Sequence, residues 1–144
     1  MFLFDEVDFV NTQDLPLSEL WKFLPVGYLF TILIETPVLL IGLSRKITFR
    51  QKLTCGAWLT ACTYPIVVLL LPAIFFGRSR FLYLLVAETF APVAECALFW
   101  LAFRGRAALG IADWTRSFTA IVLANLASFA AGEIINSYNW FGLF

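Results

Sequence analysis

Four long apolar segments limit what this chain can fold into. They cover residues 24–43, 53–76, 81–103 and about 115–135. A helix of about 20 residues crosses a hydrocarbon core of ~30 Å, and each segment is long enough to do so. The segments are too long and too continuous to be the short alternating strands of a membrane β-barrel. The sequence therefore predicts an all-α integral membrane protein.

The composition and the spacing of the segments agree with this prediction. Hydrophobic residues make up 61% of the chain and charged residues 14%, whereas a soluble domain is nearer half apolar and a quarter charged. The connections are short, so neighbouring helices are expected to run antiparallel. We expect residues 24–137 to form a four-helix transmembrane bundle whose solvent is the lipid bilayer.

The two ends of the chain differ from the bundle in composition. Residues 1–23 form an acidic segment, and residues 138–144 form an aromatic tail. The stretch DLPLSELWKFLP within the acidic segment is either a short interfacial helix that ends at Pro25 or part of an unstructured tail.

Several classes of function lack support in the sequence. The formal net charge is zero, so no basic field indicates a nucleic-acid partner. The chain has no histidine, which removes the commonest metal ligand and the usual general base. Its three cysteines lie in apolar runs without a CxxC motif, so neither a metal site nor a cofactor is expected. Paired carboxylates can serve acid–base catalysis, but no nucleophile motif accompanies them, and no catalytic residue is assigned.

The basic residues predict the orientation of the helices. Seven of the ten Lys and Arg residues lie in or beside the first and third connections: Arg45, Lys46, Arg50, Lys52, Arg104, Arg106 and Arg116. Because basic residues concentrate on the cytoplasmic side of membrane proteins, these two connections are expected in the cytoplasm. Both termini are then expected outside the cytoplasm, in a multi-pass protein of the cell membrane.

Each apolar segment carries polar residues at about the same depth. At a rise of 1.5 Å per residue, Glu35 lies near the centre of the first segment, and Glu88 and Glu95 bracket the centre of the third. The candidate site for an ion or a substrate combines these carboxylates with nearby hydroxyl, phenol and amide groups. Its members are Glu35, Thr36, Thr63, Tyr64, Glu88, Glu95, Asn125 and Ser128.

Three carboxylates at this depth need an explanation. A charged side chain at the bilayer centre costs at least ~2.5 kcal/mol, and no Lys or Arg lies near the centre of a predicted segment, since Arg116 is at the very start of the fourth. The carboxyls are protonated, or they share hydrogen bonds with neighbouring polar groups, or they bind a cation. Pro37, Pro65 and Pro92 lie in the same region. Each frees a backbone carbonyl, which either lines a cation site or only accompanies a kink made for packing.

The first and third segments resemble each other, as do the second and fourth. Aligning IETPVLLIGLSRK with AECALFWLAFRGR pairs Glu35 with Glu95, and aligning TACTYP with NLASFA pairs Thr60 with Asn125 and Thr63 with Ser128. One interpretation is two repeated helical hairpins related by an axis along the membrane normal. The other is chance, because apolar sequences resemble one another easily.

Two functions fit these features. The first is a transport component that handles protons or cations through its intramembrane carboxylates. The alternative is a structural or assembly subunit of a larger membrane complex, in which the glutamates pair with basic residues on partner helices. Four helices are few for a transport pathway, so a homo-oligomer or a larger complex is expected. Small residues in the fourth segment, including Ala124 and Gly132, form a packing face either within the bundle or toward another protein.

Overall fold

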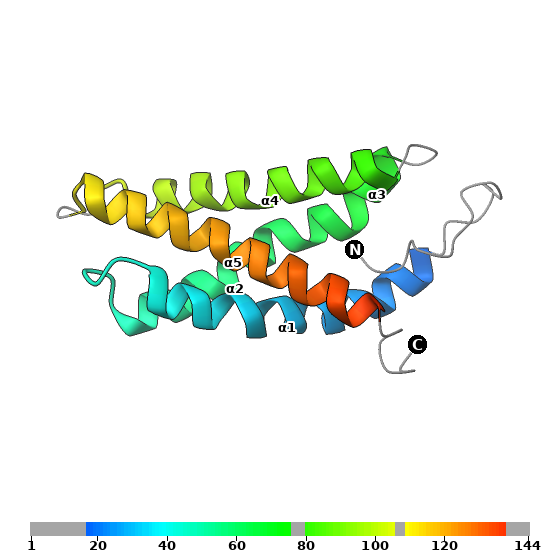
Figure 1. Cartoon of the computed structure of the whole chain (residues 1–144), viewed down its shortest axis with the longest axis horizontal. Coiled ribbons are helices and arrows are strands. Elements are labelled where there is room, and N and C mark those ends of the chain that lie inside the picture. The colour runs from blue at the N-terminus through cyan, green and yellow to red at the C-terminus, as the bar shows by residue number, and fades with distance from the viewer. Residues whose placement is uncertain (1–16, 76–79, 106–108, 138–144) are drawn as a thin grey trace.

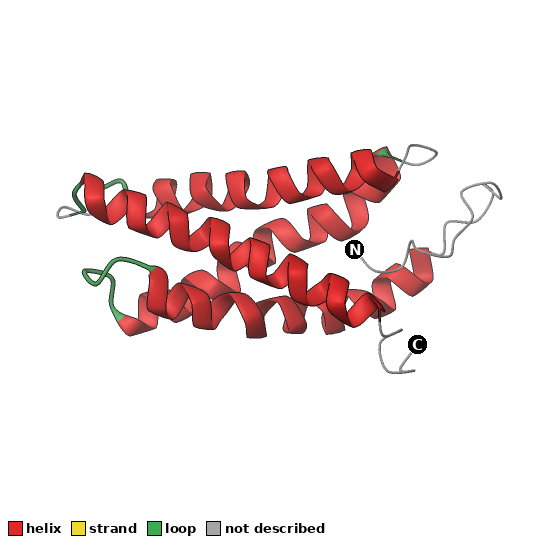
Figure 2. Cartoon of the chain, viewed as in Figure 1, coloured by secondary structure: helices red, strands yellow, loops and turns green. Residues whose placement is uncertain are grey.

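The structure is a computed structural model that describes residues 17–75, 80–105 and 109–137. Within these ranges every secondary-structure element is a helix (Figures 1 and 2). The elements are α1 (Leu17–Gly42), α2 (Phe49–Pro65), η1 (Ile66–Leu70), α3 (Leu71–Ile74), α4 (Arg80–Phe103) and α5 (Ile111–Ser137). The stretch from α2 through η1 to α3 is continuous, and η1 is a π-helical turn within it.

Four helical stretches are long and apolar enough to cross a membrane. They are Leu24–Gly42, Phe49–Ile74, Phe81–Phe103 and Ile111–Ile135. The prediction of an all-α membrane protein with four spanning helices is therefore confirmed.

Two of the helices, α2 and α5, begin earlier than the apolar runs suggested, and polar residues lie at their N-terminal ends. Thr48 and Gln51 form a capping box, in which the Thr48 N–H donates to Gln51 Oε1 at 3.0 Å and the Gln51 N–H donates to Thr48 Oγ1 at 3.4 Å. Such a box satisfies backbone N–H groups at a helix N-terminus, so α2 begins at Phe49 rather than at residue 53. In α5, Asp113 lies in the first turn and accepts a bond from the Gly110 N–H.

The first helix also differs from the expectation at its start. It begins at Leu17 and continues through Pro25, so the predicted interfacial helix is part of α1 and does not end at the proline. Pro37 lies inside the same helix. Proline within a membrane helix is tolerated when neighbouring groups satisfy the freed carbonyl, and both prolines in α1 lie within unbroken helix.

The helices form an antiparallel bundle in which α1 packs against α2 and α5, and α4 packs less extensively against the same two helices. We call the end that holds the α1–α2 and α4–α5 connections the loop end, at the left of Figure 1. The opposite end, where α1 and α4 begin and α5 finishes, is the terminal end. The two ends are packed differently.

The main apolar core lies in the half of the bundle nearer the loop end. Its members come from all four spanning helices and the first connection: Leu39, Leu43, Ile47, Cys55, Leu59, Phe99, Phe103, Ala120, Ile121 and Ala124. Small residues let α5 approach α1 closely in this half, since a Cβ added to Gly42 would lie 2.5 Å from Ala120 Cβ. Ala124 and Gly132 are buried as well. The small-residue face of α5 therefore packs within the bundle.

Two basic side chains complete the loop end of α1. The last carbonyls of a helix lack intrahelical partners, and those of residues 40–42 in α1 and of Leu43 just after it all accept side-chain hydrogen bonds. Lys52 Nζ donates to the carbonyls of residues 40 and 43 at 3.0 and 2.8 Å, and Arg116 donates to those of residues 41 and 42 at 3.0 and 2.8 Å. Positive charge also interacts favourably with the C-terminal end of a helix dipole.

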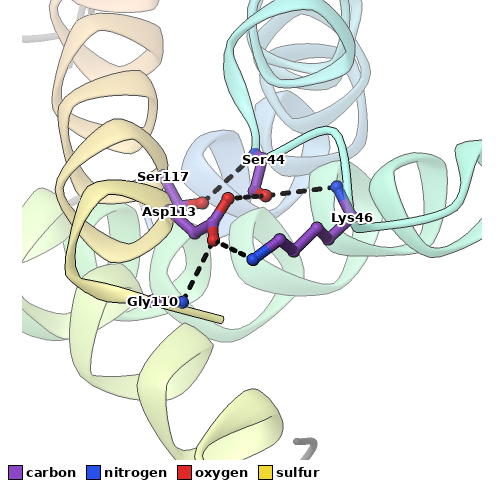
Figure 3. Close-up of polar contacts among 5 residues, drawn as sticks. All are labelled: Ser44, Lys46, Gly110, Asp113 and Ser117. Atoms are coloured by element: carbon purple, nitrogen blue, oxygen red, sulfur yellow. Dashed lines mark hydrogen bonds and ion pairs between the residues drawn. The ribbon is translucent and has the colours of Figure 1, made fainter. Parts of the chain in front are cut away.

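A polar network joins the two connections at the loop end (Figure 3). Asp113 accepts a hydrogen bond from Ser44 Oγ at 2.6 Å and forms an ion pair with Lys46 Nζ at 2.8 Å. The Ser44 N–H donates to Ser117 Oγ at 3.3 Å. The start of α5 is thus held against the α1–α2 connection, and the loop end is closed by an apolar core beneath a polar cap.

Candidate functional site

The site is built around two carboxyl groups that lie at similar depths on different helices. Glu35, on α1, is 2% exposed and accepts hydrogen bonds at both oxygens. Thr60 Oγ1, from α2, lies 2.7 Å from Oε2, and Ser128 Oγ, from α5, lies 2.8 Å from Oε1. One side chain therefore connects three helices.

Glu95 on α4 is held in the same way. It is 1% exposed, and its Oε1 lies 2.8 Å from Thr63 Oγ1 on α2. Asn125 Nδ2, on α5, donates to Oε2 at 2.8 Å and to the carbonyl of Ile121 at 3.0 Å. Both neighbours of Nδ2 are acceptors, which is the environment that an amide NH₂ group requires. Glu35 and Glu95 together connect all four spanning helices.

A partly open cavity lies beside these carboxyls. The lining residues nearest the loop end are Glu35 in α1, Thr60 in α2, Glu95 in α4 and Asn125 in α5. We call these four residues the floor of the cavity. The remaining lining residues lie nearer the terminal end, so the cavity extends from the floor in that direction.

The cavity is large enough for several water molecules or a small cation. Its volume is about 70 Å³, counted as the space that the centre of a water molecule can occupy, and one water needs ~10–15 Å³ of that measure. One turn beyond the floor, toward the loop end, Leu39, Phe99 and Ile121 are all 0% exposed. The cavity therefore ends at an apolar layer.

The third predicted carboxylate, Glu88, also lines the cavity, between the floor and the terminal end. It is partly buried, and no side chain in the described residues donates a hydrogen bond to it. Tyr64 lines the cavity too, and its ring centroid lies 6.1 Å from that of Tyr28. Glu88 is thus the carboxylate in the cavity wall without a hydrogen-bond donor from the described chain.

The structure brings together seven of the eight residues that the sequence proposed. Five form the carboxyl network, namely Glu35, Thr63, Glu95, Asn125 and Ser128. Tyr64 and Glu88 line the cavity without entering the network. Thr36 is not among the lining residues; it is buried against Gly56 of α2, and its hydroxyl has no hydrogen-bond partner in the described residues. We therefore leave Thr36 out of the site.

Sequence reasoning left Thr60 out of the candidate site, although it contacts Glu35 directly. Two signals point to it. Thr60 lies three residues before Thr63, so both share one face of α2. The alignment of the two hairpins also pairs Thr60 with Asn125, which was a candidate residue.

The three hydroxyl groups of the network have more acceptors than protons. Thr60, Thr63 and Ser128 each lie within 2.7–2.8 Å of a carboxyl oxygen and within 2.8–3.1 Å of a backbone carbonyl three or four residues earlier. A hydroxyl has a single proton to donate. It either donates to an ionised carboxylate, or donates to the carbonyl and accepts a bond from a protonated carboxyl. The same heavy-atom positions suit both states.

The arrangement can therefore take up and release a proton without moving its heavy atoms. In the described ranges, no group of three or more His, Cys, Asp or Glu side chains is placed to hold a metal ion. Comparison with known proteins adds no relative, since neither a family model, a curated protein nor a solved structure matches the chain. The function has to be inferred from the site itself.

Proposed function

We propose that this membrane protein is a transport component that takes protons or cations into the cavity between its four spanning helices. The observation that carries the proposal is that Glu35, Glu88 and Glu95, the three glutamates nearest the middle of the spanning helices, line one cavity. Ionisable groups within a membrane are costly and usually mark an ion or proton pathway. A role in packing alone does not require a space beside the carboxyls that holds several waters.

The side of entry follows from the shape of the cavity and from the charge distribution. The cavity extends from its floor toward the terminal end, and the basic connections at the loop end are proposed to face the cytoplasm. Protons or cations would then enter from the non-cytoplasmic side and reach Glu88 before Glu35 and Glu95. Release at the other side requires the apolar layer and the Ser44–Asp113 contact to separate.

Flux through liposomes tests this proposal. Purified protein is reconstituted, a pH or cation gradient is imposed, and internal dyes report H⁺, Na⁺ or K⁺. We expect gradient-driven flux that Glu35→Gln reduces to the level of empty liposomes, because the amide cannot exchange a proton or carry charge. Thr36→Val is the matched control: it alters the neighbouring residue, but that hydroxyl has no partner in the described residues. Wild-type liposomes without flux, or unchanged flux in Glu35→Gln, would contradict transport.

An assembly role remains the alternative, and Glu88 is the observation that favours it. Glu35 and Glu95 receive their donors from the same chain, so they do not need a partner's cation. Glu88 has no such donor in the described residues and suits a Lys or Arg from another subunit. Purification in mild detergent tests this: stable recovery of a partner with basic residues in its helices, lost in Glu88→Gln, supports assembly in place of transport.

A further inference from the structure

The hydrogen bonds of the two carboxyls follow one pattern. Glu35 receives one bond from α2, its partner in the first hairpin, and one from α5 of the second hairpin. Glu95 receives one bond from α5, its partner in the second hairpin, and one from α2 of the first. In the sequence alignment, the Glu35–Thr60 contact corresponds to the Glu95–Asn125 contact. The contacts between hairpins correspond too, because the alignment pairs Ser128 of the Glu35 contact with Thr63 of the Glu95 contact.

Burial follows the same correspondence beyond the site. The offset of 60 residues that relates Glu35 to Glu95 also relates Leu39 to Phe99, and all four side chains are at most 2% exposed. A chance likeness between apolar sequences explains neither the matched burial nor the exchanged hydrogen bonds. These correspondences favour two repeated hairpins, with the floor of the cavity made of two matching pairs.

We infer that Glu35 and Glu95 are two equivalent proton-binding groups, and that the species held at the floor of the cavity is the proton, one on each carboxyl. This assignment rests on the proposed function for the movement of protons across the membrane. The binding of protons to Glu35 and Glu95 is inferred from the hydrogen bonds of the network alone and does not depend on the proposed function.

The existing hydrogen bonds favour a proton over a metal cation at the floor. All four carboxyl oxygens of Glu35 and Glu95 accept a bond from the chain at 2.7–2.8 Å. A metal ion needs several oxygen lone pairs at once, and a donor from the chain already occupies one of the two lone pairs on each of these oxygens. The ion would also meet the Asn125 N–H, which has no lone pair to offer. A proton requires only that a hydroxyl turn.

The position of each proton follows from the donors. Asn125 continues to donate to Oε2 of Glu95 in either state, so the proton binds at Oε1, which faces Thr63. By the correspondence between hairpins, the proton of Glu35 binds at Oε1, which faces Ser128. On binding, a hydronium ion in the cavity gives up a proton: one of its O–H bonds breaks, an O–H bond forms at the carboxylate, and a water molecule is left. The hydroxyl hydrogen turns from the carboxylate to its backbone carbonyl. No other bond changes.

Infrared titration in detergent measures this binding without reference to transport. The C=O absorption of protonated carboxyl groups is followed against pH in a Glu88→Gln background, to remove the third carboxyl of the cavity. Compared with this background, Glu35→Gln and Glu95→Gln should each remove one titrating carboxyl, and the double variant should remove two. Ser128→Ala should shift only the band lost in Glu35→Gln, and Thr63→Val only the band lost in Glu95→Gln. Thr36→Val should shift neither.

Three results would overturn the inference: only one of the two carboxyls titrates, neither does, or NaCl, KCl, MgCl₂ or CaCl₂ removes the carboxyl bands at constant pH. If a glutamine variant does not fold, Ser128→Ala and Thr63→Val carry the test, because each removes one polar contact. Liposomes without flux but with two titrating carboxyls would reject the proposed function and leave this inference standing. Sodium flux without carboxyl titration would do the reverse.

Discussion

A single carboxyl group, that of Glu95, holds donors from two other helices at 2.8 Å each. Leaving a buried donor without an acceptor costs about 1–3 kcal/mol, so the side chain contributes to stability as well as to the site. A glutamine at position 95 can form the same hydrogen bonds as the protonated glutamate. Its carbonyl accepts from Asn125 and its NH₂ donates to Thr63, as the protonated carboxyl does.

We predict that Glu95→Ala lowers the free energy of unfolding by about 3 kcal/mol, since it leaves one Asn125 N–H without an acceptor, removes the contact with Thr63 and opens a cavity. Glu95→Gln is expected to cost less than about 1 kcal/mol because the hydrogen bonds of the protonated state persist. Unfolding of the purified protein in mixed micelles with increasing denaturing detergent measures both variants. Equal losses for alanine and glutamine would contradict the hydrogen bonding of Glu95 to both helices.

For single residues, the sequence predicted the depth along the helix better than the direction in which the side chain faces. Counting residues placed Glu35, Glu95, Asn125 and Ser128 at one level, because depth depends only on the rise per residue. Thr36 lies outside the cavity lining, because it follows Glu35 directly and consecutive residues point ~100° apart around a helix. Whether the Thr36 side chain faces the cavity or α2 depends on how α1 packs against α2. That packing involves many residues and cannot be derived from one sequence position.

Among the helices, α1 and α5 approach each other closely at Gly42. An alanine in a helix is normally more stable than a glycine by roughly 0.5–1 kcal/mol. At Gly42 this preference is reversed, since the added Cβ would lie 2.5 Å from that of Ala120. The lengths and order of the spanning helices were predictable from the apolar runs. Their first turns were not, because capping residues such as Thr48 are polar and lie outside those runs.

We predict that Gly42→Ala lowers the free energy of unfolding by about 1–3 kcal/mol, because the two helices are forced apart. Gly105→Ala is the matched control, as its added Cβ would meet nothing within 4 Å. Thermal unfolding in detergent compares the two variants. A Gly42→Ala protein as stable as the Gly105→Ala protein would rule out the close packing of α1 on α5.

In the whole molecule, the two halves of the bundle are built differently. The half toward the loop end contains the apolar core, the capped carbonyls of α1 and the network around Asp113. The half toward the terminal end contains the cavity. Local stability follows such differences in packing and in buried hydrogen bonds.

We predict that backbone amides exchange hydrogen more slowly in the loop-end half than in the terminal half of the same helix. Residues 36–42 of α1 should be better protected than residues 26–32, because the latter include residues that line the cavity. Asp113→Asn should reduce the difference, since it removes the ion pair with Lys46. Hydrogen-exchange mass spectrometry in detergent or nanodiscs measures both effects. Equal protection of the two halves would contradict the asymmetry.

The π-helical turn after Pro65 has a further consequence for the shape of the cavity. Within it the N–H of Leu71 donates to the carbonyl of Ile66, one residue further back than in an α-helix. If the turn relaxed to α geometry, the rest of the helix would rotate by ~100°, and Val67 would change its place in the cavity wall. The Tyr83 hydroxyl on α4 donates to the Val67 carbonyl at 3.1 Å. This hydrogen bond between helices joins α4 to the π-helical turn that lines the cavity.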